Sequence, residues 1–119
     1  MRYNQSMKII TEILSSDELK QMAAATFGNL VKAVVDVDRE IIAVDAELHS
    51  DLEALLLENG SKQKNLWGIN LYPEIQGEDF VEFDSMINMR PSQGNRSRGI
   101  ENEDIRKKII AIAAKRIKR

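Results

Sequence analysis

The polar loop RPSQGNRSRG at positions 90–99 contains the residues best suited to binding a ligand. Its three arginines carry planar guanidinium groups, whose donors match phosphate and carboxylate oxygens. Serine, glutamine and asparagine add neutral donors, and two glycines allow backbone amides to approach a ligand closely. The predicted ligand-binding residues are Asn88, Arg90, Ser92, Gln93, Asn95, Arg96, Ser97 and Arg98. The loop follows neither the Walker nor the dinucleotide-binding glycine pattern, so it predicts no nucleotide-binding motif.

Acidic side chains on one face of a predicted sheet form a second group of candidates. Divalent cations such as Mg²⁺ or Mn²⁺ take carboxylate oxygens as ligands. The candidate metal ligands are Asp36, Asp45, Glu82 and Asp84. Strand alternation places Lys32 and Asn70 on the same face. The alternative is a solvated face with ordinary acids, because nothing in the spacing forces these groups together. No cofactor is expected unless this cluster forms.

His49 is the only histidine, and therefore the only side chain whose unperturbed pKa lies near neutral pH. It directly precedes a predicted helix and follows Glu47 closely, where it could act as a general base. The sequence offers it no nucleophilic partner, so an ordinary residue at a helix entry is the alternative. His49 is the candidate catalytic residue if the chain is an enzyme.

Capping residues and apolar periodicity predict three helices. Ser15 and Glu18 form a capping box at the start of the first helix, which Gly28 ends. Ser50 is predicted to cap the second helix and Asn102 the third. The lysines of the third helix fall opposite its apolar stripe and are expected to point outward.

Two hairpins and a short strand at residues 7–11 account for the predicted strands. In residues 31–46, a turn at positions 38 and 39 pairs residues whose numbers sum to 77, such as Val35 with Ile42 and Val31 with Ala46. Residues 66–72 and 80–89 are typical of a second hairpin. The prediction is an α+β fold, with a four- to five-stranded, mostly antiparallel sheet and three helices largely on one face. The other sheet face is expected to be open.

Length and composition predict one soluble domain over residues 1–119. Met7 can serve as an alternative start, and residues 1–6 are therefore expected to be a disordered N-terminal extension of the domain. Hydrophobic residues make up 43% of the chain and charged residues 30%, values typical of a globular protein. The absence of cysteine excludes disulfides and thiolate chemistry. Because no apolar run is long enough for a membrane span or secretory signal, we expect no membrane association and a cytoplasmic location.

Charge is distributed unevenly along the chain. Residues 90–119 have ten basic and three acidic side chains, giving +7, and residues 1–89 have seven and sixteen, giving −9. Residues 90–119 therefore form a basic tail and residues 1–89 an acidic body. The basic tail can bind phosphates, or it can neutralise the acidic body or form a solvated helix face. Trp67 and Tyr72 are the only plausible stacking groups, so any binding to nucleic acid is not expected to be sequence-specific.

The chain resembles an uncharacterised family of small bacterial and archaeal proteins in three segments, VVDVDREIIAVDAELH, LLLENGSKQKNLWGINLYP and EFDSMINMRPSQGNRSRGIENEDIRKKI. The resemblance covers nearly the whole chain after Met7 and implies a single-domain protein of unknown function. Members of the family often have a proline at the start of the last helix, where this chain has Glu103, a change that the first helical turn tolerates. The resemblance implies no activity, cofactor or catalytic residue.

The leading functional hypothesis is a small binding or interaction protein that takes a phosphate-bearing or other anionic small molecule at the 90–99 loop. A homo-oligomer is expected, formed through the open sheet face. One rival hypothesis is a metal-dependent phosphoester hydrolase that uses the sheet-face carboxylates and His49. Another is a structural subunit of a protein complex, and the sequence leaves open whether the chain is an enzyme.

Overall fold

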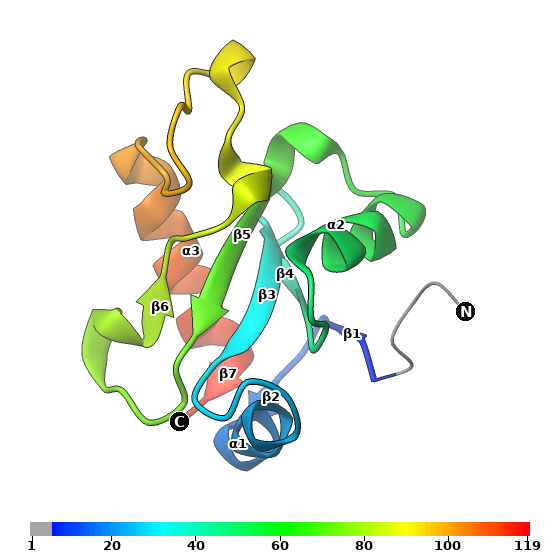
Figure 1. Cartoon of the computed structure of the whole chain (residues 1–119), viewed down its shortest axis with the longest axis vertical. Helices are drawn as coiled ribbons and strands as arrows, with labels where there is room; N and C mark the ends of the chain where they lie inside the picture. The colour runs from blue at the N-terminus through cyan, green and yellow to red at the C-terminus, as the bar shows by residue number, and fades with distance from the viewer. Residues whose placement is uncertain (1–5) are drawn as a thin grey trace.

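The computed structural model describes residues 6–119, which form a five-stranded antiparallel sheet with three helices (Figure 1). The strand order is β1-β4-β3-β5-β6. The strand bounds are Lys8–Ile10 for β1, Val31–Asp36 for β3, Ile41–Val44 for β4, Leu66–Leu71 for β5 and Val81–Glu82 for β6. The predicted α+β class is confirmed. Except for Ser6, the predicted N-terminal extension lies outside the described residues.

The three helices are α1 (Ser16–Ala25), α2 (His49–Glu58) and α3 (Glu103–Arg116). Four short 3₁₀ segments, η1 to η4, cover Gln63–Asn65, Gly77–Phe80, Met86–Asn88 and Pro91–Gln93. A separate parallel pair joins β2 (Leu14–Ser15) to β7 (Ile117–Lys118) and holds the two ends of the fold side by side. Two-residue strands carry no alternation, which is why the sequence pattern does not predict this pair.

The predicted caps of the first and third helices are confirmed. Ser15 Oγ accepts a hydrogen bond from Glu18 N, and Glu18 Oε1 accepts one from Ser15 N, which completes the capping box. Asn102 Oδ1 accepts from Ile105 N at the start of α3. Side-chain acceptors at both helix starts thus satisfy backbone donors that would otherwise lack an intrahelical partner.

The start of α2 differs from the prediction. The cap predicted at Ser50 is wrong, because the helix already begins at His49 and the preceding residue, Leu48, provides no side-chain cap. The His49 ring contacts the sheet through the carbonyl of Ile69, and this contact accompanies the earlier helix start. α2 therefore begins with backbone N–H groups that no capping side chain satisfies.

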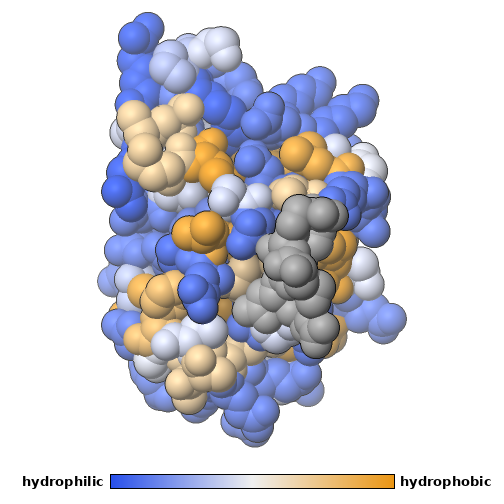
Figure 2. All heavy atoms as spheres, turned by 45° about the vertical axis from the view of Figure 1, so that its right-hand side comes forward, coloured by the Kyte–Doolittle hydropathy of each residue, from blue (hydrophilic) through white to orange (hydrophobic). Residues whose placement is uncertain are grey.

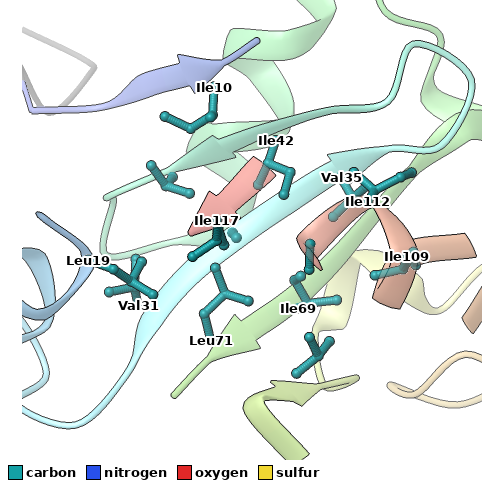
Figure 3. Close-up of a cluster of buried hydrophobic side chains, with 14 of the residues drawn as sticks. Ile10, Leu19, Val31, Val35, Ile42, Ile69, Leu71, Ile109, Ile112 and Ile117 are labelled. Carbon is teal, nitrogen blue, oxygen red and sulfur yellow. The ribbon is translucent and has the colours of Figure 1, made fainter. Parts of the chain in front are cut away.

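The larger core lies between the sheet and the helices α1 and α3. Val35, Ile42 and Ile69 project from the strands toward Ile109 and Ile112 of α3 (Figure 3). All five side chains have 3% or less of their surface exposed. This face follows the predicted alternation, because every second residue of β3 and β5 points into it.

α2 covers the other face of the sheet. Leu52 and Leu56 pack there against Val34, Ala43 and Leu66 in a second, smaller core. The expectation that this face is open is therefore wrong at its centre, since strand residues on both faces are buried. The argument for a homo-oligomer through an open apolar face loses its basis, and the oligomeric state stays a prediction.

The register of the first hairpin is confirmed. Val35 faces Ile42 in the antiparallel pairing of β3 and β4, as the sum of 77 predicts. The turn is longer than predicted and spans residues 37–40, with Glu40 in the left-handed region at φ +56°. β4 ends at Val44 because Asp45 also adopts a positive φ, of +78°, so the predicted pair of Val31 with Ala46 does not form.

The strand predicted over residues 80–89 is mostly wrong. Only Val81–Glu82 pairs with β5, and the chain then leaves the sheet and forms η3. Further along the edge of β5, the side chain of Asn88 bonds the backbone of Gly68 in place of a neighbouring strand. No helix within residues 6–119 combines the length and apolar character that a membrane span requires.

Candidate functional site

A pocket of about 210 Å³ opens between the start of α2, the strands β3 and β5, and the loop after β6. We name it the His49 pocket, and its lining residues are Lys32, Leu48, His49, Ser50, Asn70, Asp84, Ser85, Met86, Ile87 and Arg98. Three of the predicted site residues, His49, Asp84 and Arg98, therefore meet in one place. His49 comes from the start of α2, and Asp84 and Arg98 come from the loop that follows β6.

The sheet supplies a polar part of the pocket through one cross-strand pair. Lys32 on β3 faces Asn70 on β5, and both lie on the α2 side of the sheet. Asn70 is only 7% exposed, and its Nδ2 donates to Glu82 Oε1 at 2.8 Å and to the Asp84 carbonyl at 3.4 Å. Its Oδ1 is buried and accepts no hydrogen bond within the described part of the chain. Buried acceptors of this kind are rare in folded proteins.

His49 lies against β5 as a neutral imidazole. Its Nε2 is 2.8 Å from the carbonyl oxygen of Ile69, which can only accept, so Nε2 carries the proton and Nδ1 is the basic nitrogen. Burial lowers the pKa of His49, and nearby Lys32 lowers it further, whereas the Ile69 carbonyl, Asp84 and the Asn70 amide partly raise it.

Gly68 allows His49 and Ser85 to approach the strand closely. A Cβ at this position would lie 2.5 Å from Ser85 Cβ and 3.2 Å from His49 Cδ2. The space next to the glycine is therefore occupied by two residues that line the pocket. Gly68 thus has a packing role beside the site, and its φ is not positive.

The loop after β6 is held in place by the amide of Asn88, which is fully buried. Asn88 Oδ1 accepts from Gly68 N at 2.8 Å, and Nδ2 donates to the Gly68 carbonyl at 2.9 Å. The same Nδ2 donates to the Arg98 carbonyl at 2.9 Å, and Ser85 N donates to that carbonyl at 3.0 Å. These bonds fix the backbone of Arg98 beside the pocket.

The guanidinium of Arg98 pairs with an acid of the same pocket. Arg98 Nε lies 2.7 Å from Asp84 Oδ1, and the two side chains are 56% and 43% exposed. Exposed pairs of this kind are worth only about 0–1 kcal/mol. A ligand anion can therefore compete for Arg98 at little cost.

Other predicted ligand-binding residues have partners inside the chain. Arg90 stacks on Trp67, 4.1 Å from the ring centre, and donates to the carbonyls of Gln63 and Leu66. Asn95 Nδ2 donates to the carbonyls at positions 88, 97 and 99, and its Oδ1 accepts from the backbone of Glu101. The donors of Asn88 and Asn95 and the two terminal nitrogens of Arg90 thus build the loop, whereas the buried Nε of Arg90 has no partner within the described residues. Ligand binding by these three residues stays a prediction, because none of them lines the pocket.

The remaining loop residues lie outside the His49 pocket. Gln93 Nε2 makes one long bond of 3.3 Å to the carbonyl of Lys64. The backbone N of Arg96 donates to Glu101 Oε2, and its side chain is not part of the pocket lining. Ser92 and Ser97 also do not contribute to that lining. Of the eight predicted ligand-binding residues, only Arg98 reaches the pocket.

The predicted metal ligands do not form a cluster. Asp36 is fully buried and accepts from Asp38 N, Arg39 N and Ser61 Oγ, a network that joins the hairpin turn to the end of α2. Asp45 lies at the end of β4, in a different hollow beside α1. Glu82 accepts from Asn70 and Tyr72, and Asp84 pairs with Arg98. Within residues 6–119, no three carboxylate or imidazole groups are placed to hold a metal ion.

Several pocket residues were not predicted as site residues. Lys32 and Asn70 are expected on this sheet face from the strand alternation, but they have no sequence spacing that marks a site. Leu48, Met86 and Ile87 give no signal at all, because apolar residues normally indicate core packing. Only the placement of α2 across the face shows that these side chains surround a pocket.

The pKa of His49 predicts how stability changes with pH. Because burial lowers this pKa in the folded state, the unfolded chain binds a proton more readily. Stability is therefore fully present above the unfolded pKa of about 6.5 and is lost as the pH falls below it. We expect urea denaturation at pH 7.5 and pH 5.5 to show a larger loss for the natural chain than for His49→Gln. Equal losses in the two chains would contradict this assignment.

Comparison with known proteins identifies a family but no function. The model of one protein family, described as protein of unknown function (DUF5674), matches residues 8–116 of the chain. No curated protein and no solved structure matches it. The family match agrees with the resemblance found in the sequence, and the chemistry must be inferred from the pocket.

Proposed function

The chain belongs to the DUF5674 family, whose description assigns no activity, and we propose that it binds a small anionic ligand in the His49 pocket. Lys32 and Arg98 carry the proposal, because these two cationic side chains line a pocket that has one carboxylate. The buried acceptor Asn70 Oδ1 lacks a partner there, so the ligand is also expected to bear a hydrogen-bond donor. An unpaired buried acceptor costs about 1–3 kcal/mol, and a ligand donor that reaches it recovers this free energy.

The start of α2 adds to the positive potential of the pocket. Leu48, His49 and Ser50 form the first turn and line the pocket, and no side chain caps this turn. The positive end of the helix dipole and its unsatisfied backbone N–H groups favour an anion. The pocket lining has two cationic side chains, Lys32 and Arg98, and one carboxylate, that of Asp84. Because His49 is neutral, the net charge of the lining is positive.

The charges favour the His49 pocket over a larger hollow of about 400 Å³ between η2 and α3. That hollow is lined by three acids, Glu78, Asp79 and Glu103, and by two bases, Arg106 and Lys107. It includes none of the buried side-chain atoms that lack a hydrogen-bond partner within residues 6–119. The hollow therefore offers neither a net positive charge nor an unused acceptor.

Two arginines of the same loop provide a matched test. We expect Arg98→Ala to raise the Kd for an anion about tenfold, since a hydrogen bond to a charged group is worth about 1.5–3 kcal/mol. Arg96→Ala removes the same charge outside the pocket lining and is expected to change the Kd less than about twofold. Calorimetric titration with inorganic phosphate, citrate and nucleoside monophosphates measures both variants.

A third variant separates the pocket from a general effect of charge. Asp84→Asn removes the negative charge that competes with an anion for Arg98 and is expected to tighten anion binding. Equal losses for Arg96→Ala and Arg98→Ala would indicate diffuse attraction by the basic tail and would overturn the proposed site. The same holds if no anion in the panel binds the natural chain.

A further inference from the structure

We infer that the ligand of the His49 pocket is a free α-amino acid with an apolar side chain. This inference rests on the proposed function and names the ligand class of that site, a zwitterion whose carboxylate is the anionic group that Lys32 and Arg98 bind. It follows from three kinds of surface that line one small pocket: acceptors, cations and exposed apolar side chains. Each of them matches one group of an apolar amino acid.

The acceptors match an ammonium group. Asn70 Oδ1 is buried and has no partner within the described residues, and His49 Nδ1 is the unprotonated nitrogen of a neutral ring. Asp84 contributes a carboxylate of which Arg98 contacts one oxygen, Oδ1. An ammonium group donates three hydrogen bonds, and these three residues offer three acceptors, one of them charged.

The cations match a carboxylate. Lys32 and Arg98 line the pocket together with the uncapped first turn of α2. An amino acid carries its carboxylate one carbon away from its ammonium group, so a site for it must present acceptors and cations side by side. The Arg98–Asp84 pair does this, because it places a guanidinium and a carboxylate 2.7 Å apart.

The apolar side chains match an aliphatic group. Leu48 is 55% exposed and Met86 is 64% exposed, and both line the pocket with Ile87. Figure 2 shows the molecule with the α2 side turned forward, where hydrophobic side chains form separate groups among hydrophilic ones. Two large, exposed apolar residues beside buried polar groups are typical of a binding pocket. The volume of about 210 Å³ is below the usual range of drug-sized sites, which suits a single amino acid.

Calorimetric titration of the full chain with L-leucine and four partial analogues tests this inference. Isocaproate lacks the amino group, isoamylamine and L-leucinamide lack the carboxylate, and L-serine lacks the apolar side chain. We expect L-leucine to bind at least about tenfold more tightly than each analogue, because each one loses a charge-assisted bond or apolar contact. Weak binding of L-leucinamide and isocaproate also distinguishes a free amino acid from a peptide end, which carries only one of the two charges.

Two methionines of the same segment give a matched control. Met86→Ser is expected to raise the Kd for L-leucine about five- to tenfold and to leave the Kd for inorganic phosphate within about twofold. Met89→Ser changes a residue that is 43% exposed but outside the pocket lining, and it is expected to change neither. Unchanged unfolding midpoints in urea confirm that both variants fold.

The outcomes separate this inference from the proposed function. If isocaproate or L-serine binds as tightly as L-leucine, the amino-acid assignment is overturned. If phosphate binds with dependence on Arg98 and L-leucine does not bind, the proposed function stands and the inference fails. If neither binds, both fail. Binding of L-leucine that Met86→Ser weakens and Met89→Ser does not would support the inference, and it would support the proposed function as well if an anion of the panel also binds with dependence on Arg98.

Discussion

Replacing Asn88 with alanine is expected to lower the free energy of unfolding by about 3 kcal/mol, because a buried amide that makes three hydrogen bonds is lost. Asn88 is 0% exposed, and its amide bonds both backbone groups of Gly68 and the carbonyl of Arg98. The substitution leaves both backbone groups of Gly68 unpaired at the edge of β5, and the Arg98 carbonyl keeps only its bond from Ser85 N. The loop that holds Arg98 at the pocket should loosen, so ligand affinity should fall together with stability.

Urea denaturation measures this loss, and two further variants locate its cause. Gln93→Ala removes an amide of the same loop that makes one bond of 3.3 Å, and it is expected to change stability by less than about 0.5 kcal/mol. Asn88→Asp keeps an acceptor for Gly68 N but loses both donors and buries a charge, so it should destabilise at least as much as alanine. A loss for Asn88→Ala of less than about 1 kcal/mol would show that the amide does not hold the loop.

Much of the fold follows from local patterns in the sequence. The pairing of Val35 with Ile42 follows from the alternation on either side of a turn, because a slip by one residue would move every side chain to the other face. The caps at Ser15 and Asn102 follow from residue type and spacing. These features depend on contacts within a few residues, and this is the information that a single sequence contains.

The covering of the second sheet face could not be predicted in the same way. Val34, Ala43 and Leu66 show that part of this face is apolar, but an apolar face can pack on a helix of the same chain or on another chain. Only the three-dimensional path of the chain decides between them. For the same reason, the strand predicted over residues 80–89 ends early, because a side chain, that of Asn88, occupies the edge of β5.

The candidate site was predicted in part, and the missed part has a chemical reason. Amide and guanidinium groups that bind a ligand are the same groups that bond backbone carbonyls inside a loop. Asn88 and Asn95 use their donors within the chain, as do the two terminal nitrogens of Arg90, whereas Arg98 contacts an exposed acid beside a pocket. Residue type therefore marks a polar, arginine-rich segment, and the structure places only Arg98 of its three arginines in the lining of the pocket.

Replacing Gly68 with alanine is expected to destabilise the fold by about 3 kcal/mol through steric overlap in a packed region. The backbone of Gly68 has no positive φ, so alanine suits its conformation, and in an open strand this change would be mildly stabilising. Here the new Cβ would lie 2.5 Å from Ser85 Cβ and 2.6 Å from Ser85 Oγ. Cβ is fixed by the backbone, so rotation of the serine side chain cannot relieve the overlap, and the loop itself must move.

Gly99→Ala is the matched control, because the nearest atom to its new Cβ is 3.5 Å away and its φ is also not positive. We expect that variant to stay within about 0.5 kcal/mol of the natural chain. A double-mutant cycle then tests the cause, since Ser85→Gly removes the side chain with which alanine would overlap. If overlap is the cause, the pair Gly68→Ala with Ser85→Gly should recover at least about 1 kcal/mol relative to additivity.

The same cycle connects packing to binding, because Ser85 and His49 both line the pocket and both lie beside Gly68. Gly68→Ala should therefore weaken anion binding at least about tenfold even under conditions where the variant is fully folded, since a displacement of about 1 Å is enough to misplace polar contacts. Gly99→Ala should bind as the natural chain does. If Gly68→Ala loses stability and keeps its affinity, the pocket does not depend on this close approach, and the ligand site must lie elsewhere on the chain.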